Sequence, residues 1–438
     1  MMAAASGNLQ DIPESLDIAI VGAGAAGLAA AIFARRACPS ARVVLLDGAP
    51  RPGAKILVSG GGRCNVTNTI VSDVDFWGGR RTIIRRVLRA LPVPETAAFF
   101  LDLGLPLHEE AGGKLFPDSN QARDVLNALV SGVGAAGATL IPGTRVQSLA
   151  RVDAGFRLET SRRSMQARAV VLATGGRSLP KSGSDGAGYD FARTLGHTIV
   201  EPTPALAPFL LEPETPYSIH QGLSGVAVEG ELSVWIDGSL ETRLSGALLW
   251  THFGVSGPVA LNVSRHWARA RLAERPVRVT LNFHPRESFD EVNARWVAAA
   301  ARRPRASARS VLAADLPDAV AVAVLGVLGI AADQTVAALT REDRRRLIHG
   351  LTEWPLPILD TRGYNYAEVT SGGVELTEID PGTMESRVCP GLFLAGEILD
   401  VDGRIGGFNF QWAWSSAYVA ARGLAAHLSA SAATPFRG

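Results

Sequence analysis

The sequence predicts an α/β protein whose dinucleotide-binding domain is interrupted by a β-rich part and a helical part. A short apolar stretch, Ile18 to Val21, is followed by spaced glycines, an alanine-rich segment and a second apolar stretch, Val43 to Leu46. Leu210 to Phe283 mostly alternates apolar and polar residues, as short strands do, whereas Ser288 to Leu351 is rich in Ala, Arg and Leu and is predicted to be helical. The α/β pattern returns at residues 358–438, so the chain leaves the first domain and re-enters it.

The N-terminal stretch has the order of a Rossmann-like βαβ unit, with Gly22, Gly24 and Gly27 between strand and helix. One glycine permits the turn, one lets the backbone approach a pyrophosphate, and one allows close packing of helix and strand. The pyrophosphate is then expected at the positive end of the helix, beside Ala25 and Ala26.

An acid ends the second strand of this unit. Asp47, followed by Gly48, stands where a carboxylate can accept hydrogen bonds from both hydroxyls of a ribose. A second triplet, Gly132, Gly134 and Gly137, has the same spacing but comes after a helical pattern. It cannot aim a helix N-terminus at a phosphate, so it predicts a helix end and a turn.

Two later segments indicate which dinucleotide is held. One buried strand ends in glycines near residue 175, and another ends in Gly396 and Glu397. The Glu397 carboxylate can accept hydrogen bonds from the ribityl chain or on the pyrophosphate side of the cofactor. The final helix, predicted from Asn409 to Leu428, starts at two glycines that aim N–H groups at a flavin ring. This second element is typical of two-dinucleotide-fold, glutathione-reductase-like flavoproteins, so FAD is predicted. The predicted cofactor contacts here are Ala173, Thr174, Gly175, Gly176, Gly396, Glu397, Gly406, Gly407, Phe408, Asn409 and Gln411.

A glycine-rich loop between Arg51 and Asn68 supplies further predicted cofactor contacts. Three consecutive glycines allow backbone conformations that other residues avoid, so the loop can pass close beneath a flat ring or around a phosphate. Cys64 has no partner cysteine nearby, and a small buried residue is favoured there over a redox thiol. The contacts predicted from this loop are Lys55, Ser59, Gly60, Gly61, Gly62, Arg63, Cys64 and Asn65.

The stretch from Lys55 to Asn68 (KILVSGGGRCNVTN) resembles the flavoprotein family that contains the BaiN-type bile-acid reductases and the aminoacetone oxidase group. Further stretches resemble this family, in the same order: Gly113–Pro117, Ala173–Tyr189, Leu249–Pro258, Val369–Val374, Thr383–Ser386 and Ala395–Gly403. The resemblance implies an FAD domain (1–200 and 358–438), an inserted β-barrel-like domain (201–285 and 350–357) and a small helical domain (286–349). The sequence departs from the family at four positions. Asp47 stands where many members have glutamate, and Ala247 replaces a common acidic residue. Ile405 and Phe408 stand where threonine and tyrosine are frequent.

The resemblance implies an FAD-dependent oxidoreductase that reduces an enone-like carbon–carbon double bond of a small organic substrate. The sequence contains no second nucleotide-binding pattern, so NADH or NADPH is expected to bind only transiently as reductant. His252, between an apolar strand and a helix, could protonate the substrate after hydride transfer. A hydrogen-bonded structural role for His252 stays open.

The alternative to an enzyme that acts on a small organic substrate is a flavin-bearing RNA-modification or RNA-binding factor of the same FAD fold. The net charge of +1 argues against it, whereas the arginines from Arg302 to Arg309 keep it open; a solvated helix face is favoured for them.

Composition limits the remaining possibilities. The three cysteines form no C-x-x-C pair and no metal-ligand cluster is apparent, so no metal is expected. Residues 1–16 lack a basic region with an apolar core, and Ala319 to Ala332 is too short to span a bilayer. A cytoplasmic protein with a small-molecule substrate, without nucleic-acid or membrane partners, is therefore expected. The oligomeric state stays open.

Overall fold

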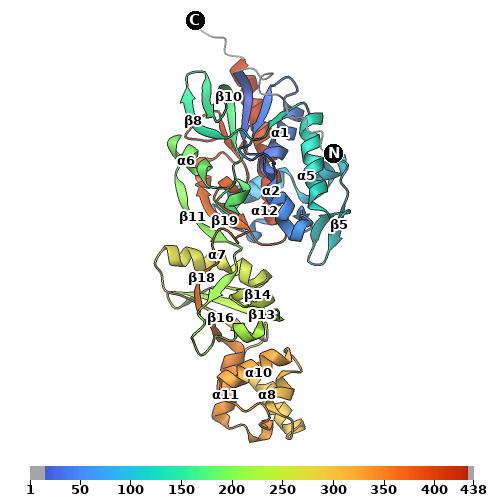
Figure 1. Ribbon diagram of the computed structural model, residues 1–438, viewed down its shortest axis with the longest axis vertical. Helices are drawn as coiled ribbons and strands as arrows, with labels where there is room; N and C mark the ends of the chain where they lie inside the picture. The colour runs from blue at the N-terminus through green and yellow to red at the C-terminus, as the bar shows by residue number, and fades with distance from the viewer. Residues whose placement is uncertain (1–14, 433–438) are drawn as a thin grey trace. The chain divides into compact units, whose positions relative to one another are not determined.

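A computed structural model describes residues 15–432 of the chain, which form two compact units (Figure 1). The first unit comprises the described residues through Pro202 and those from Glu368 onward, and the second is Thr203–Ala367. The helices between residues 289 and 352 belong to the second unit and do not separate as a third. The N-terminal segment in which we expect no secretory signal lies almost wholly outside the described residues. No helix within residues 15–432 is long and apolar enough to cross a bilayer.

The first unit is built on a seven-stranded sheet with the order β7-β2-β1-β10-β9-β8, and β20 also pairs with β10. Strands β7, β2, β1, β10 and β20 are parallel, whereas β9 and β8 continue the sheet antiparallel. The strands are β1 (Ser15–Val21), β2 (Val43–Leu46), β7 (Thr139–Ile141), β8 (Val146–Val152), β9 (Gly155–Thr160), β10 (Ser164–Leu172) and β20 (Leu392–Leu394). The predicted βαβ unit is thus confirmed, and the C-terminal strand joins the same sheet.

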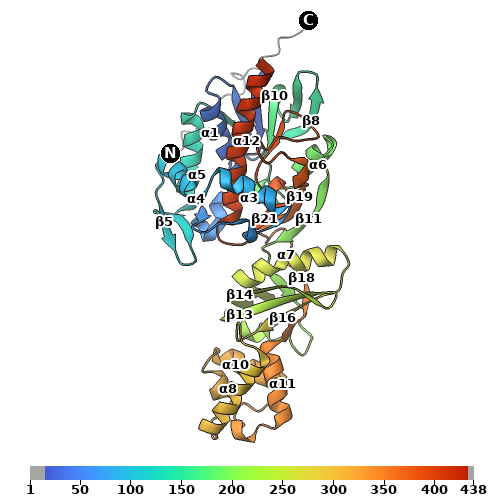
Figure 2. The same ribbon diagram turned by 180° about the vertical axis from the view of Figure 1, so that it is seen from behind.

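Helix α1 (Ala25–Ala37) is the crossover of the βαβ unit and is buried from Ala26 to Ala34. Figure 2 shows α1 beside the long helix α12 (Phe408–Ala432). The small side chains of α1 let the two helices pack closely. Gly137, with φ +82°, follows the end of α5, so the second glycine triplet ends a helix as predicted. The other helices of this unit are α2 (Ala54–Val58), α3 (Arg81–Ala90), α4 (Val93–Asp102), α5 (Ala122–Ala135) and α6 (Ala187–Thr194).

Short strands complete the first unit: β3 (Thr67–Asn68), β4 (Phe76–Gly78), β5 (Leu107–Glu110), β6 (Lys114–Pro117), β11 (Ile199–Ala205), β19 (Val369–Val374) and β21 (Val401–Gly403). The sequence from Glu368 to Leu376 predicts a hairpin around Gly372 and Gly373. This prediction is wrong, because both glycines lie inside β19, which pairs with β11. A Cβ on Gly372 would lie 2.7 Å from the carbonyl oxygen of Glu201, and one on Gly373 would lie 2.6 Å from that of Ile398. These glycines therefore permit close approach of backbones and do not form a turn.

The second unit contains a seven-stranded antiparallel sheet with the order β17-β16-β13-β14-β15-β12-β18. The alternating run from Glu231 to Ile236, followed by Asp237 and Gly238, predicts a strand and a turn. This prediction is confirmed, because the hairpin from β13 to β14 turns at these two residues, both with positive φ. The strands are β12 (Phe209–Leu211), β13 (Ala227–Ile236), β14 (Ser239–Thr251), β15 (Gly254–Ser256), β16 (Val277–Asn282), β17 (Trp354–Leu356) and β18 (Ile358–Thr361).

Five helices accompany this sheet: α7 (Pro258–Leu272), α8 (Phe289–Arg302), α9 (Ala308–Leu312), α10 (Asp318–Val327) and α11 (Arg341–Thr352). Helix α7 packs on the sheet and begins with Pro258 after Gly257. The sequence predicts Ser256 as its cap, which is wrong, because Ser256 lies in β15 and its side chain does not bond the helix. Helix α10 is part of the apolar core, as its composition predicts.

Candidate functional site

The three glycines between β1 and α1 have three different surroundings. Gly22 has φ +101°, and a Cβ there would lie 2.6 Å from the carbonyl oxygen of Ala173. A Cβ on Gly27 would lie 1.8 Å from the carbonyl oxygen of Gly22, so this glycine lets the helix pack on the turn. A Cβ on Gly24 would meet nothing within 4 Å, so the space beside Gly24 is open to a ligand. These surroundings match the separate tasks predicted for the three positions.

The N-terminus of α1 has the features of an anion-binding site. Gly24 is its N-cap, no side chain caps the helix, and its first turn contains no acidic residue. The unsatisfied N–H groups and the positive end of the helix dipole therefore favour a phosphate there. Thr174 lies next to this turn, and no described residue bonds its buried hydroxyl, which is thus available to a ligand.

Asp47 supports the glycine turn from the end of β2. Its Oδ2 accepts a hydrogen bond of 2.6 Å from the backbone N–H of Ala23, and its Oδ1 accepts one of 2.7 Å from that of Ala49. Burial raises the pKa of Asp47, and the two hydrogen bonds oppose that rise. Each carboxylate oxygen keeps a second lone pair, so contact with a ribose is compatible with this arrangement.

The triple-glycine loop has an exposed, left-handed backbone. Gly60, Gly61 and Gly62 have φ values of 55°, 67° and 86°, and a Cβ on Gly61 would meet nothing within 4 Å. Such a ridge has no side chains and lets a flat group lie directly on the backbone. It follows α2, which carries Lys55.

The residues after this ridge are partly engaged by the protein itself. The Nη1 of Arg63 lies 2.6 Å from Oε1 of Glu110, and its guanidinium lies 4.1 Å from the ring centroid of Phe116. Cys64 is fully buried, and burial raises the pKa of its thiol to about 12, so it stays protonated. No described residue bonds the buried Oδ1 of Asn65.

Lys55 and Glu397 form the polar centre of the site. The Nζ of Lys55 lies 2.6 Å from Oε2 of Glu397 and 3.0 Å from the hydroxyl of Ser178. Oε1 of Glu397 accepts hydrogen bonds from that hydroxyl (2.9 Å) and from the backbone N–H of Thr370 (2.9 Å). Sequence reasoning missed Ser178 and Thr370, although Thr370 belongs to the Val369–Val374 motif.

The turn after β10 touches this network. A Cβ on Gly176 would lie 2.4 Å from Oγ1 of Thr370 and 2.8 Å from Oε1 of Glu397. A Cβ on Gly175 would lie 3.8 Å from Nζ of Lys55. The structure therefore brings together Lys55, Gly175, Gly176 and Glu397, which the sequence predicts from three separate segments.

The start of α12 is joined to the end of the triple-glycine loop. The side-chain amide of Asn68 donates to the carbonyl oxygen of Gly406 (3.3 Å), and the Thr67 hydroxyl donates to Oε1 of Gln411 (2.6 Å). Phe408 is buried, and Asn409 uses its amide on both backbone groups of Gly403. At these last two positions the side chains serve the protein, so a ligand there would meet the backbone.

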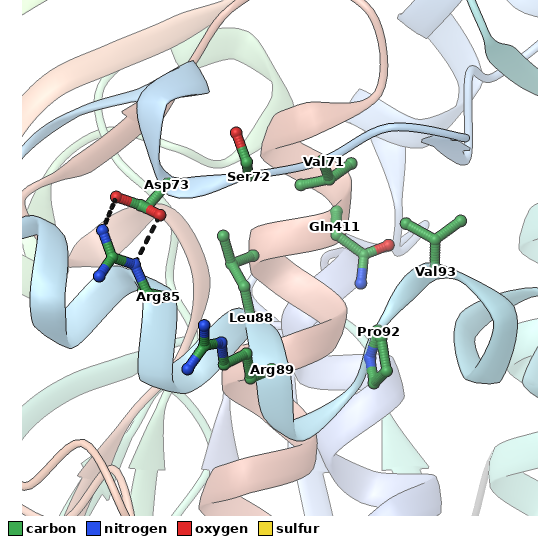
Figure 3. Close-up of a pocket in the computed structure, with 9 residues that line it drawn as sticks. All are labelled: Val71, Ser72, Asp73, Arg85, Leu88, Arg89, Pro92, Val93 and Gln411. Carbon is green, nitrogen blue, oxygen red and sulfur yellow. Dashed lines mark hydrogen bonds and ion pairs between the residues drawn. The ribbon is translucent and has the colours of Figure 1, made fainter.

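Gln411 also lines a cavity of about 230 Å³, which sequence reasoning did not indicate (Figure 3). Its amide nitrogen donates to the carbonyl oxygen of Leu91 and the hydroxyl of Thr96. An ion pair between Asp73 and Arg85 borders the same cavity. The remaining lining residues are Val71, Ser72, Leu88, Arg89, Pro92 and Val93.

His252 lies in the second unit, whereas all other predicted site residues lie in the first. It occupies the turn between β14 and β15, its side chain is exposed, and its ring meets the Phe253 ring edge-on at 5.1 Å.

The residues of the first unit fit FAD. An open glycine backbone stands at an uncapped helix N-terminus, where a pyrophosphate is best stabilised. The buried hydroxyl of Thr174 and amide oxygen of Asn65 lack protein partners and can bond a ligand. Within residues 15–432 no three His, Cys, Asp or Glu side chains are grouped to hold a metal ion.

Comparison with known proteins gives one family for almost the whole chain. The profile described as "HI0933-like protein Rossmann domain" matches residues 16–423. The 3-dehydro-bile acid delta(4,6)-reductase of Clostridium scindens is 32% identical over 408 residues, covering 93% of this chain and 98% of that protein. The ribosomal RNA dihydrouridine synthase of Escherichia coli is 35% identical over 422 residues, with 94% and 99% covered. The protein of that name from Haemophilus influenzae is 32% identical over 406 residues, with 92% and 96% covered.

Proposed function

The chain belongs to the HI0933-like family of FAD-binding flavoprotein oxidoreductases, and from this premise we propose that it reduces a carbon–carbon double bond conjugated with a carbonyl group. The observation that carries the proposal is the chemistry named for its relatives. A delta(4,6)-reductase of a 3-dehydro steroid and a dihydrouridine synthase both add hydrogen across such a bond. The substrate is thus defined by a conjugated carbonyl and not by its carbon skeleton.

We propose that NADH or NADPH supplies the electrons and binds transiently. FAD, when bound, supplies the two-electron chemistry between pyridine nucleotide and substrate. The chain holds the pyrophosphate at the N-terminus of α1 and the ribose at Asp47. Lys55 and Glu397 present charged groups, and the starts of η2 (Ser59–Gly62) and α12 present backbone groups, to the rest of the cofactor.

His252 is proposed to supply the proton that the substrate takes up. The described cysteines are all free, which suits a reducing cytoplasm.

Anaerobic mixing tests this function. The purified yellow protein is mixed with NADH or NADPH, and flavin bleaching is followed at its visible absorption band. Cyclic enones, unconjugated alkenes and saturated ketones are then added separately. The proposal predicts reoxidation by the enones alone. Reoxidation by none of them, or equally by unconjugated alkenes, would contradict it.

A uracil ring in RNA is a second candidate substrate, since its double bond is also conjugated with a carbonyl. Two relatives named as ribosomal RNA dihydrouridine synthases support it, as does helix α3. Three arginines at this helix form no ion pair among the described residues: Arg80, Arg86 and Arg89. Exposed guanidinium groups without counter-charges attract phosphates.

RNA binding separates the two candidates. Fluorescence anisotropy with a labelled RNA would compare the wild type with an Arg80→Gln/Arg86→Gln/Arg89→Gln variant. The second candidate predicts a loss of roughly tenfold or more in affinity and a shallower salt dependence in this variant. The matched control is Arg278→Gln/Arg286→Gln/Arg341→Gln, which removes three exposed charges from the second unit outside the Arg302–Arg309 cluster. Equal effects of both variants would count against α3 as an RNA contact.

A further inference from the structure

A row of stacked side chains lies on the second unit. The guanidinium carbon of Arg362 lies 3.5 Å from the ring centroid of Tyr366 and 4.2 Å from that of Phe253. His252 continues the row through its edge-on contact with Phe253. Two members come from the turn after β14 and two from the segment after β18, so the fold brings together residues that are more than a hundred positions apart.

The row is open to a ligand. Tyr366 is 51% exposed and His252 is exposed, whereas Arg362 and Phe253 are half-buried. An aromatic ring that is fixed by a cation on one side and exposed elsewhere is a platform for another planar group. Single exposed aromatic residues are common, but this one is part of an ordered stack.

Arg362 is held there without an ion pair. No carboxylate within residues 15–432 pairs with its guanidinium, whereas Arg275 and Arg309 of the same unit pair with Asp237 and Asp318 at 2.8 Å and 2.6 Å. Contact with two aromatic rings removes water from the flat faces of the guanidinium and leaves its N–H edge free to donate. A cation in this setting is suited to bind an oxygen that carries negative charge.

We propose that His252, Phe253, Arg362 and Tyr366 bind the conjugated carbonyl ring of the substrate. The ring stacks on Tyr366, and its carbonyl oxygen accepts hydrogen bonds from Arg362. This inference rests on the proposed function and adds the residues that recognise the substrate.

The assignment gives Arg362 a defined part in the reaction. Reduction consumes one hydride, derived from NAD(P)H, and one proton. The hydride bonds to the β-carbon, the electron pair of the double bond shifts, and the carbonyl oxygen becomes an enolate oxygen. Donors already directed at that oxygen stabilise the charge as it develops. The proton bonds to the α-carbon. Arg362 cannot release it, because guanidinium stays protonated, so the proposed donor within the row is His252.

Binding of 4-nitrophenol tests the site without turnover. Its phenolate is planar and carries negative charge on an oxygen, as an enolate does. Equilibrium dialysis against the FAD-loaded protein, at a pH where the phenol is ionised, gives the dissociation constant. Arg362→Gln is expected to weaken binding about tenfold or more, because a hydrogen bond to a charged group is lost. Tyr366→Leu is expected to weaken it by a smaller factor, and Arg362→Lys to restore part of the affinity.

The matched control is Arg278→Gln, which removes an exposed guanidinium that lies 4.7 Å from the Trp235 ring centroid in the same unit. Unchanged binding in Arg362→Gln, or an equal loss in the control, would overturn the site. If the Arg362→Gln variant reduces enones as fast as the wild type, this inference is overturned and the proposed function is not. Phenolate binding that depends on Arg362, in a protein that reduces no enone, would overturn the proposed function and leave the site standing.

Discussion

The ammonium group of Lys55 and the carboxylate of Glu397 lie 2.6 Å apart, although 342 positions separate them in the chain. Lys55 belongs to α2, just before the triple-glycine loop, and Glu397 follows β20 in the C-terminal part of the first unit. Their side chains are 23% and 19% exposed, so the pair is only partly screened by water. It ties the two separate chain segments of the first unit together beside the turn at Gly176.

Removing one partner of this pair should weaken FAD retention. Lys55→Met leaves the carboxylate of Glu397 without its cation, and the negative charge then faces a cofactor that carries phosphates. Loss of a charge-assisted hydrogen bond costs about 1.5–3 kcal/mol. We expect FAD affinity, measured by quenching of flavin fluorescence, to fall roughly tenfold or more. Glu397→Gln keeps the acceptor oxygen and should lose less. If both variants bind FAD as the wild type does, the pair does not contact the cofactor.

Gly24→Ala should separate cofactor binding from folding. The backbone of Gly24 has φ −82°, which alanine adopts freely, and a Cβ there meets no protein atom within 4 Å. The FAD-free protein should therefore keep its melting temperature. The added methyl occupies the space predicted for the pyrophosphate, so FAD affinity should fall at least about tenfold, as judged by calorimetry.

The matched control for this substitution is Gly222→Ala, where the added Cβ also meets nothing within 4 Å. It should alter neither the melting temperature nor FAD affinity. If the Gly24→Ala protein retains FAD as the wild type does, the pyrophosphate does not bind at the N-terminus of α1.

Local patterns account for the parts of the fold that were predicted. Strands β1 and β2 are short apolar runs flanked by turn residues, and α12 follows two glycines, so each element is encoded within a few neighbouring positions. Gly372 and Gly373 were misread for a physical reason. Positive φ serves both tight turns and close backbone contacts, and only the neighbouring strand distinguishes the two.

The site was predicted less completely than the fold. A motif of spaced glycines can be recognised from the sequence alone. Ser178 and Thr370 acquire their role only because folding brings them to Glu397. The link between Arg362 and Phe253 has the same origin, since it joins two segments that are remote in sequence. Residue type indicates which chemistry is possible, but tertiary contacts decide which groups meet.

Cys64 should be chemically silent. Burial raises the pKa of its thiol to about 12, so the reactive thiolate is scarce near neutral pH. Cys64→Ala should retain FAD and keep turnover within about twofold of the wild type, since a thiol without a thiolate form makes no redox contribution. In the native protein, Ellman's reagent should react first with the half-buried Cys38. A large loss of turnover in Cys64→Ala, with no loss in Cys38→Ala, would indicate that Cys64 takes part in the redox chemistry.

Two histidines, the buried His284 and the partly buried His266, should make the second unit sensitive to acid. Burial lowers the pKa of His266 and of His284 from 6.5 to about 4 in the folded protein. Between these values the unfolded chain binds more protons than the folded one, so the free energy of unfolding should fall as pH drops from 6.5 toward 4. The slope approaches about 1.4 kcal/mol per pH unit for each histidine.

Urea unfolding at a series of pH values, followed by tryptophan fluorescence, measures this slope. A His266→Gln/His284→Gln variant should show a flatter profile in the same pH range, even if its stability at neutral pH is lower. An unchanged slope would mean that other groups cause the acid sensitivity.

His252→Ala should slow the chemistry on the substrate more than the reduction of the flavin by NAD(P)H. The exposed ring belongs to the second unit, whereas the predicted FAD contacts belong to the first, so FAD absorbance and affinity should stay near the wild-type values. A positioned acid acts on the proton that the substrate takes up, a step worth typically about 10²–10⁴-fold. Rapid mixing measures the two half-reactions separately. Equal slowing of both would indicate that His252 supports the fold or the flavin, and no change in either would make it a structural turn residue. Because Arg362 cannot donate the proton, a selective loss in His252→Ala would also identify His252, and not the hydroxyl of Tyr366, as the acid of the stacked row.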